Sequence, residues 1–442
     1  MSQKPNILIL FTDQQRRDTI HELGNERIIT PALDEIAREA VVFDNCFTPA
    51  PVCVPARFSM YSGLYPGHTG CCNNNGANVY EGSGFYDAIT KSGYESCCVG
   101  KMHHVVDSYG LMGFSERHTQ EELSYERDDY TNFIRNSPYK NVFDYNGQRS
   151  EMYYIPQISQ LPIEAHPTQW VGDRSVEFIE KAEGDKPLFL MASFIHPHPP
   201  FAPPAPWNKM YRTVSEDPYM PADRAEFEPF MSDRFTKEKI GISRQDLTLL
   251  RNYYYSCISF VDYQISRIIK ALKDKGLYDN TVIMFSTDHG EMLGDHGIWG
   301  KHNCAYDEVW RIPMLISFPH GEQAGKVRYD MMNSCDILPT CLEAASAEPI
   351  ACDGVSVYRE TDRKYTFAEG EGFMAVTDGS AKYVHIRKRG KNGNIVENYR
   401  EFTDLVGDPD EFENRIGHPE CQGKLAELRG VLIDHVIDRV LP

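Results

Sequence analysis

Short, unbroken runs of apolar residues recur along the chain, and segments with helical periodicity lie between them. Runs of this length without alternation are typical of strands buried on both faces of a parallel sheet. In the helical segment 30–40, Thr30 can cap the helix and Pro31 occupies its first turn. The pattern predicts an α/β fold with helices on both faces of a large parallel sheet. The predicted strands are NILILFT (6–12), ESCCVG (95–100), LFLMASFI (188–195), TVIMFST (281–287) and PMLISFP (313–319), and further helices are predicted at residues 169–183 and 246–275.

The pattern changes after about residue 355. FMAVTD (373–378) and residues 381–405 alternate around the turn residues GKNGN, and a helix closes the chain, which predicts a small antiparallel unit. We therefore expect a large α/β domain over residues 1–355 and a C-terminal α+β subdomain over residues 356–442. Residues 113–165 are polar and aromatic without a clear period, which predicts loops over a ligand pocket.

Chemically capable side chains follow four of the predicted strands. Taken singly, each has an ordinary explanation, because an acid after a strand can cap a helix and most lysines are solvated at the surface. In open α/β sheets, however, ligands bind beyond the carboxyl ends of the strands, so we expect these side chains to converge. They are Asp13, then Lys101 and His103, then His196 and His198, and finally Asp288 and His289.

Net charge and apolar content limit the partners. A formal charge of -19 argues against nucleic acid or acidic membrane surfaces, so an anionic substrate must be held by local positive charge. The N-terminal segment is interpreted as a strand rather than a signal peptide, and no stretch approaches a membrane-spanning length, so we expect a cytoplasmic protein. The twelve cysteines are expected to remain thiols, with structural roles for the pairs Cys71/Cys72 and Cys97/Cys98. The sequence leaves a homo-oligomer open.

Cys53 lies in the stretch PVCVPAR. A cysteine of this kind is most often a small, buried apolar residue. Pro55 suits the first turn of a helix, which would put Cys53 at a helix N-terminus where free N–H groups favour anions.

The residues around Cys53 add a family resemblance. CVPAR followed by FSMYSGLYPGHTG resembles the C-x-P-x-R signature of the type I sulfatases, the formylglycine-dependent enzymes of the alkaline phosphatase superfamily. Further matches follow in order: PNILILFTDQQRRD, GKMH, HPHPPF and TDHGEMLGDHGIWGKH. The resemblance implies an alkaline-phosphatase-like sandwich, with a large, mostly parallel sheet between helices and a small C-terminal antiparallel subdomain. The commonest signature has Ser where this chain has Ala56, but the C-x-P-x-R frame is intact.

The resemblance also implies a reaction. A maturation enzyme would oxidise Cys53 to formylglycine, and Arg57 would hold the aldehyde hydrate; one hydroxyl attacks sulfur, and the other, once deprotonated, expels sulfate. Lys101 and Lys301 match sulfate-binding lysines, His103 the base that triggers sulfate release, and His198 the histidine that helps protonate the leaving alcohol. Asn74, His196 and His302 match substrate-binding positions; His196 is the alternative for the role of His198, and Asn74 in NNN also suits a turn.

The resemblance places one divalent ion at Asp13, Gln14, Asp288 and His289. Hard oxygen ligands favour Ca²⁺, with Mg²⁺ or Mn²⁺ as alternatives. The pattern has Gln14 in place of a second acid and His289 beside Asp288, which resembles the branch of choline sulfatases and phosphonate monoester hydrolases. The nitrogen ligand favours Mn²⁺ more than an all-oxygen site would. Asp295 and His296 repeat the Asp-His pair and are interpreted as structural.

The predicted function is a sulfuric ester hydrolase that acts on a small sulfate ester, with a sulfated carbohydrate as the leading substrate. A phosphonate monoester hydrolase or phosphodiesterase is the alternative, because the same fold serves those esters; such enzymes generally lack the pair Lys101 and His103. A zinc phosphatase would need a Ser or Thr nucleophile and ligands for a second metal. A non-catalytic, sulfatase-like binding protein would be expected to lack the nucleophile or the lysines, and all are present.

Overall fold

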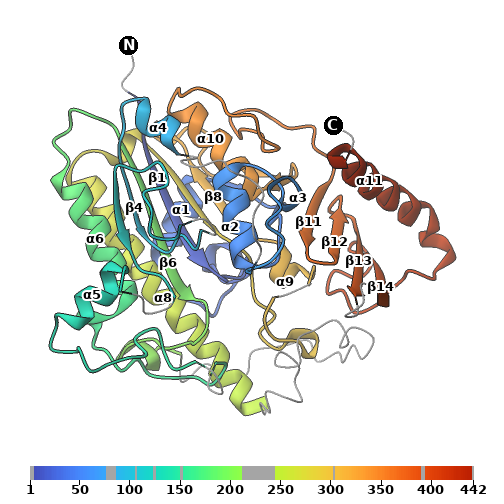
Figure 1. Ribbon diagram of the computed structural model, residues 1–442, viewed down its shortest axis with the longest axis horizontal. Coiled ribbons are helices and arrows are strands. Elements are labelled where there is room, and N and C mark those ends of the chain that lie inside the picture. The colour runs from blue at the N-terminus through green and yellow to red at the C-terminus, as the bar shows by residue number, and fades with distance from the viewer. Residues whose placement is uncertain are drawn as a thin grey trace.

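An eight-stranded sheet with helices on both faces forms the larger part of the computed structural model, and a four-stranded antiparallel sheet lies beside it (Figure 1). The structure describes residues 4–75, 86–104, 107–122, 126–149, 153–211, 244–301, 304–389 and 394–440. The strands of the large sheet follow the order β5-β4-β6-β1-β7-β8-β2-β9. Their bounds are β1 Asn6–Asp13, β2 Val41–Phe43, β4 Glu95–Gly100, β5 Glu116–Thr119, β6 Leu188–Pro197, β7 Thr281–Thr287, β8 Met314–Ser317 and β9 Val327–Arg328.

Strands β4, β6, β1 and β7 are parallel neighbours. Ile7, Ile9 and Phe11 of β1 enter the apolar cluster on one face, and Leu8 and Leu10 enter the cluster on the other. Burial on both faces explains why these strands are continuous apolar runs, and their carboxyl ends meet at one edge of the sheet, as the sequence predicts.

Strand β8 corrects one prediction. It is buried like its neighbours but runs antiparallel to β7. A continuous apolar run records burial on both faces and not strand direction, so it cannot distinguish the two arrangements. Among the described residues between β7 and β8, the one α-helix is the short α9 (Asp307–Trp310), in place of the long helix expected of a parallel crossover.

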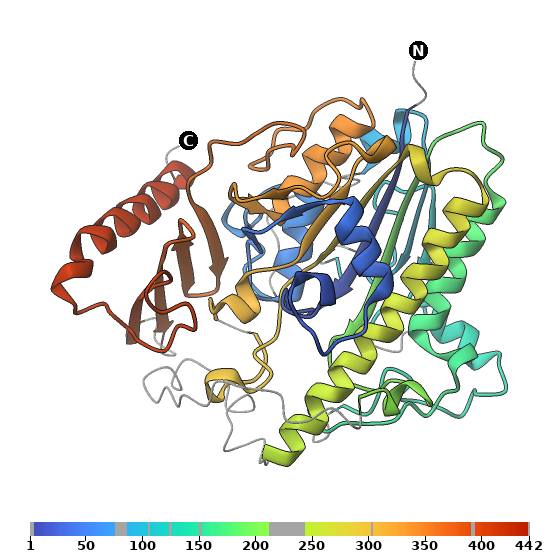
Figure 2. The same ribbon diagram turned by 180° about the vertical axis from the view of Figure 1, so that it is seen from behind.

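Helices cover the two faces in separate groups. Figure 1 shows the face that carries α2 (Cys53–Ser62), α4 (Asp87–Lys91) and α10 (Ile337–Ala344), and Figure 2 shows the other face, with α1 (Pro31–Glu39), α6 (Pro167–Lys181) and α8 (Arg244–Asp274). The helices predicted at residues 30–40, 169–183 and 246–275 are therefore confirmed. No described helix is long and apolar enough to cross a membrane.

The first turn of α1 is capped by another helix and not by Thr30. The Thr30 hydroxyl donates to Asp34 (3.1 Å) and makes no bond to the helix backbone. The N–H groups of Ala32 and Leu33 instead donate to the carboxylate of Asp262 on α8, at 3.1 and 2.8 Å. The predicted cap is wrong because a carboxylate from a packed helix satisfies two free N–H groups at once.

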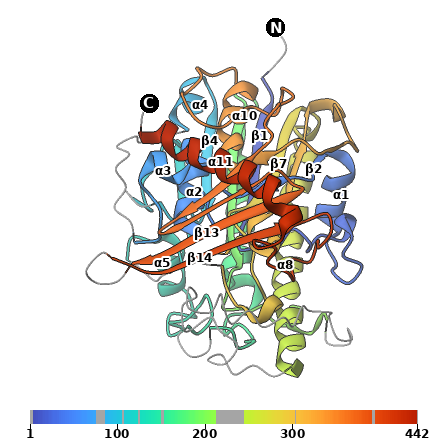
Figure 3. The ribbon, with the colours of Figure 1, turned by 90° about the vertical axis from the view of Figure 1, so that its right-hand side faces the viewer.

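The C-terminal sheet consists of β11 (Thr366–Gly370), β12 (Phe373–Thr377), β13 (Ala381–Arg389) and β14 (Ile395–Asp404) in antiparallel order. Helix α11 (Gln422–Val440) packs across it (Figure 3). The predicted antiparallel strands are confirmed and β11 is an additional one, whereas residues 390–393 of the GKNGN turn lie outside the described residues.

Short elements complete the fold. The segment 113–165, predicted to be loops, also contains β5 and α5 (Asp129–Arg135). Strand β5 is polar because it is an edge strand, so its sequence lacks an apolar run. All twelve cysteines are thiols in the structure, as the sequence predicts. The other described strands and α-helix are β3 (Cys46–Phe47), β10 (Met332–Asn333) and α3 (Pro66–Thr69), and short 3-10 helices lie in the connections.

Candidate functional site

Cys53 is the first residue of α2, as Pro55 in the first turn predicts. The side chain is buried, and its Sγ lies 2.9 Å from Lys301 Nζ, 3.2 Å from His289 Nε2 and 3.8 Å from Asp13 Oδ1. Residues from two distant parts of the chain, the end of β1 and the loop after β7, therefore surround this one sulfur atom.

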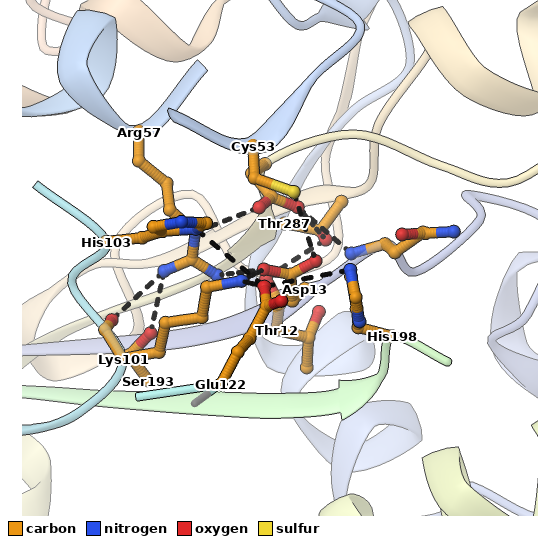
Figure 4. A network of polar contacts seen from close by, with 12 residues as sticks. Thr12, Asp13, Cys53, Arg57, Lys101, His103, Glu122, Ser193, His198 and Thr287 are labelled. Atoms are coloured by element: carbon orange, nitrogen blue, oxygen red, sulfur yellow. Dashed lines mark hydrogen bonds and ion pairs between the residues drawn. The ribbon is translucent and has the colours of Figure 1, made fainter. Parts of the chain in front are cut away.

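Arg57, one turn further along α2, joins the ends of four strands. Its Nε donates to Asp288 (2.9 Å), and its Nη2 donates to Asp13 (3.0 Å). Its Nη1 donates to the Lys101 carbonyl (3.0 Å) and to the Ser193 hydroxyl of β6 (3.1 Å), as Figure 4 shows. Burial alone would lower the pKa of Arg57, but Asp288 and Asp13 hold it well above its ordinary value. The guanidinium is therefore a permanent cation between two buried carboxylates.

Asp13, Asp288 and His289 form a group of donors around Cys53. One ligand atom from each of the four residues lies within 4.8 Å of every other. Asp288 Oδ1 accepts from the backbone N–H groups of Gln14 and His289, both at 2.9 Å, which orients the carboxylate.

The imidazole of His289 is prepared to act as a ligand. Its Nδ1 lies 2.9 Å from the carbonyl oxygen of Gly290, so Nδ1–H donates there and the free lone pair is on Nε2, which faces Cys53. Burial lowers the pKa of His289 to about 4, which keeps the ring neutral. Two carboxylates and a neutral imidazole together fit a divalent cation.

Gln14 lies directly beside this donor group. Its backbone has a positive φ of 67°, which turns the chain sharply after β1. Its Oε1 accepts from Lys301 Nζ at 2.5 Å, and its amide group donates to the buried Glu291. Glu291 also accepts from the N–H groups of Leu293 (3.1 Å) and Gly300 (2.6 Å), so it orders the loop that carries Lys301.

Two lysines bring positive charge to the same place. Lys101 Nζ donates to Asp13 (2.6 Å) and to Glu122, and Lys301 Nζ donates to Gln14 and Cys53. Burial alone would lower the pKa of Lys101, but Asp13 and Glu122 raise it above its ordinary value, so the amine stays protonated. Neither lysine is the solvated surface residue that was the ordinary alternative.

His198 faces the site through Nε2. Its Nδ1 lies 2.7 Å from the Pro199 carbonyl, which accepts the Nδ1 proton, while Nε2 lies 3.4 Å from the Tyr153 hydroxyl and 3.7 Å from Glu122. Burial holds the pKa of His198 well below its ordinary value, so Nε2 carries a free lone pair. His103 also faces Glu122, with 3.7 Å between its Nδ1 and the carboxylate.

The other predicted residues have different surroundings. Asn74 Oδ1 accepts from the N–H of Val54 (3.0 Å), so it caps the first turn of the helix that carries Cys53. His196 Nδ1 lies 3.0 Å from the Thr168 hydroxyl of α6, and its ring packs on His166 instead of Cys53. His302 lies outside the described residues.

Asp295 agrees with its structural interpretation. Its carboxylate accepts from Arg16 (2.7 Å) and from Arg251 of α8 (2.6 Å). These ion pairs tie the loop after β7 to a long helix and do not point toward Cys53.

Sequence reasoning missed three residues that lie at the site. They come from the polar segment after β4, where no apolar run or motif signals a role. Because β5 is parallel to β4, its carboxyl end adjoins that of β4 and places the following residues near Lys101. The missed residues are Glu122, Arg149 and Tyr153.

Comparisons with known proteins agree with this geometry. The family model described as Sulfatase matches residues 5–347. The arylsulfatase of Clostridium perfringens is 30% identical over 484 residues, and the alignment covers 99% of this chain and 95% of that protein. The choline-sulfatase of Rhizobium meliloti is 26% identical, with 94% of this chain and 83% of that protein covered.

Solved structures show the same architecture. The phosphonate monoester hydrolase of Agrobacterium radiobacter superposes with a TM-score of 0.82 at 24% identity, covering 98% of this chain and 96% of that chain. A protein solved in complex with its substrate D-glucosamine-2-N,6-O-disulfate superposes with a TM-score of 0.77 at 20% identity, covering 99% and 98%. The alkaline-phosphatase-like fold expected from the sequence is confirmed.

The bridging geometry of Arg57 leads to a stability prediction. Arg57→Lys keeps a positive charge but cannot reach both carboxylates, so we expect the free energy of unfolding to fall by about 3 kcal/mol or more. The control is Arg174→Lys, because Arg174 pairs with Glu177 at the surface; its effect should stay below about 0.5 kcal/mol. Urea unfolding of both variants provides the measurement, and equal losses would contradict the bridging role.

Proposed function

The chain belongs to the sulfatase family and hydrolyses sulfuric esters, and from that premise we propose that it does so with a formylglycine made from Cys53 and with one divalent metal ion. The observation that supports this most directly is the position of Cys53 Sγ, within 4 Å of Lys301, His289 and Asp13. A nucleophile made from this side chain lies between a cation and the donor group of a metal. A formylglycine-generating enzyme would supply the modification.

The metal would be held by Asp13, Gln14, Asp288 and His289. When bound, the ion would make a hydroxyl of the aldehyde hydrate more acidic and would neutralise charge on the attacked group. Gln14 joins this set because its side-chain oxygen lies beside Lys301 at the edge of the donor group. The oxygen-rich set favours Ca²⁺, and the His289 nitrogen keeps Mn²⁺ open.

The protein's own residues bind the ester and move the protons. Lys101 and Lys301 are buried cations, the first paired with Asp13 and the second in contact with Cys53, so they can hold the sulfate oxygens where negative charge develops. His198 presents Nε2 without a proton, so it acts as an acid toward the leaving alcohol only after that nitrogen has gained one. Glu122 favours this gain, because its negative charge raises the pKa of His198 against the effect of burial.

The substrate is proposed to be a small sulfate ester, with a sulfated carbohydrate as the leading class. One structural neighbour was solved with a disulfated glucosamine, which supports this choice by likeness of fold alone. Two neighbours with TM-scores of 0.82 are phosphonate monoester hydrolases, so hydrolysis of such esters is the second candidate. Lys101 and His103 favour sulfate, because those hydrolases generally lack this pair.

Replacement of Cys53 tests the nucleophile. We expect Cys53→Ala to abolish sulfate ester hydrolysis, because it removes the sulfur atom that the modification would convert and that lies beside Lys301 and His289. Peptide mass analysis of the wild-type protein, made with a maturation enzyme present, should show the aldehyde in place of the thiol. An unmodified thiol in fully active protein would disprove the formylglycine proposal.

A panel of esters tests the reaction on the same preparation. Sulfate, phosphate and phosphonate esters of one chromogenic alcohol are compared by kcat/KM. We expect the sulfate ester to be preferred. Faster turnover of the phosphonate ester would establish the second candidate instead.

The metal site can be tested without turnover. Calorimetric titration of wild-type protein with Ca²⁺, Mn²⁺ and Mg²⁺ should detect one site, and Asp288→Asn should weaken binding by about 10-fold or more, because it removes a charged ligand. Asp279→Asn, which alters an acid on the turn before β7, is the matched control. Unchanged binding in Asp288→Asn would remove Asp288 from the ligand set.

Lys101 provides a test of sulfate binding. Lys101→Met should lower kcat/KM for the sulfate ester by about 100-fold, the size expected when one group that stabilises developing charge is lost. Lys140→Met, which alters an exposed lysine, should leave kcat/KM unchanged. If Lys101→Met also leaves it unchanged, Lys101 does not hold the sulfate.

A further inference from the structure

Glu122 places a carboxylate inside the cationic part of the site. Its Oε1 accepts from Lys101 Nζ and lies 3.7 Å from both His103 Nδ1 and His198 Nε2, as Figure 4 shows. One carboxylate oxygen, a ring nitrogen of His103 and Cys53 Sγ all lie within 4.8 Å of one another. The carboxylate is therefore a neighbour of the proposed nucleophile and not only of the lysine.

Arg149 holds the other side of this carboxylate. Its Nη2 donates to Glu122 Oε2 at 2.8 Å, and its guanidinium lies over the Tyr153 ring at 5.7 Å from the centroid. Burial alone would raise the pKa of Glu122, but the surrounding His198, Lys101, His103 and Arg149 hold it well below its ordinary value. Glu122 thus keeps a full negative charge at neutral pH.

An ester attacked at position 53 and held by Lys101 must place its anionic oxygens next to Glu122. The charge on those oxygens differs between ester classes. A sulfate monoester carries one negative charge, whereas a phosphate monoester carries nearly two above its second pKa of about 6. At separations near 5 Å and an effective dielectric constant of about 20, one additional unit charge changes binding by more than 10-fold.

We propose that Glu122 is a specificity-determining residue that selects esters by charge: it admits a singly charged sulfate ester and disfavours a doubly charged phosphate monoester. This inference rests on the proposed function and deepens it. The fold and the metal donors can serve both ester classes, so a group that responds to the second charge must come from elsewhere in the site. Glu122 is such a group, because its carboxylate contacts Lys101 and it is not among the proposed metal ligands.

A purely positioning role for Glu122 predicts a different result. If Glu122 only holds Lys101, His103 and His198 in place, its loss should lower the hydrolysis of every ester by a similar factor. Charge selection instead predicts that the ratio between two esters changes. The ratio of kcat/KM values therefore separates the two roles, and it is independent of the fraction of protein that carries the aldehyde.

The experiment compares wild-type protein, Glu122→Gln and Glu122→Asp at pH 8. The substrates are the sulfate monoester, the phosphate monoester and the singly charged phosphodiester of 4-nitrophenol, and the aldehyde content of each preparation is measured by mass. We expect the sulfate-to-phosphate ratio of kcat/KM to fall by about 10-fold or more in Glu122→Gln. The same sulfate-to-phosphate ratio should change by less than about 3-fold in Glu122→Asp, because this variant keeps the negative charge. Glu122→Asp also provides a second variant if Glu122→Gln does not fold. The ratio of sulfate to phosphodiester should stay constant in both variants.

Glu164→Gln, which removes an exposed carboxylate, is the control for net charge and should leave both ratios unchanged. An unchanged sulfate-to-phosphate ratio in Glu122→Gln would overturn the inference and leave Glu122 as a positioning residue. Wild-type protein that carries the aldehyde but hydrolyses no sulfate ester would overturn the proposed function, and this inference with it. The two failures are therefore distinguished by the wild-type protein alone.

Discussion

Two buried carboxylates at neighbouring strand ends would repel each other and lose their hydration, and the guanidinium of Arg57 compensates for both effects. It donates to Asp13 of β1 and to Asp288 after β7, and its remaining bonds reach the Lys101 carbonyl after β4 and the Ser193 hydroxyl of β6. Removing one partner from such a buried group leaves an uncompensated charge, which costs far more than a surface ion pair. Arg57 lies on the same helix as Cys53, so this interaction also sets the nucleophile against the strand ends.

Charges of opposite sign alternate from this point toward the rim of the site. Asp13 lies between Arg57 and Lys101, Lys101 lies between Asp13 and Glu122, and Glu122 lies between Lys101 and Arg149. Burial removes water from each of these charges, and ion pairs with the neighbouring charges compensate for the lost hydration. The polar groups are thereby oriented before any substrate enters, which is the arrangement that stabilises developing charge most effectively.

Much of the site follows from the sequence, because continuous apolar runs locate the strands and the motif residues lie at their ends. The choice of His198 over His196 rested on the family resemblance, because the strand pattern alone could not make it. β6 is irregular here: Phe11 pairs with Ser193 but Asp13 pairs with Pro197, so four residues of β6 cover two of β1. Regular alternation would place His196 and His198, two residues apart, on the same face, and this bulge is where the structure departs from that alternation. Glu122 was missed for another reason, since the polar edge strand before it carries no apolar pattern.

The division between predictable and unpredictable residues has a functional meaning. Asp13 and Asp288 end strands that must be buried, so their positions are tied to the core and can be recognised from its pattern. The connection that carries Glu122 and Arg149 contributes Tyr130, Ile134 and Tyr145 to an apolar cluster, but Glu122 and Arg149 themselves are in none, so packing places few limits on their identity. A fold that serves several ester classes can change its preference most readily in such a connection, because substitutions there alter the charge around the ester without disturbing the metal donors.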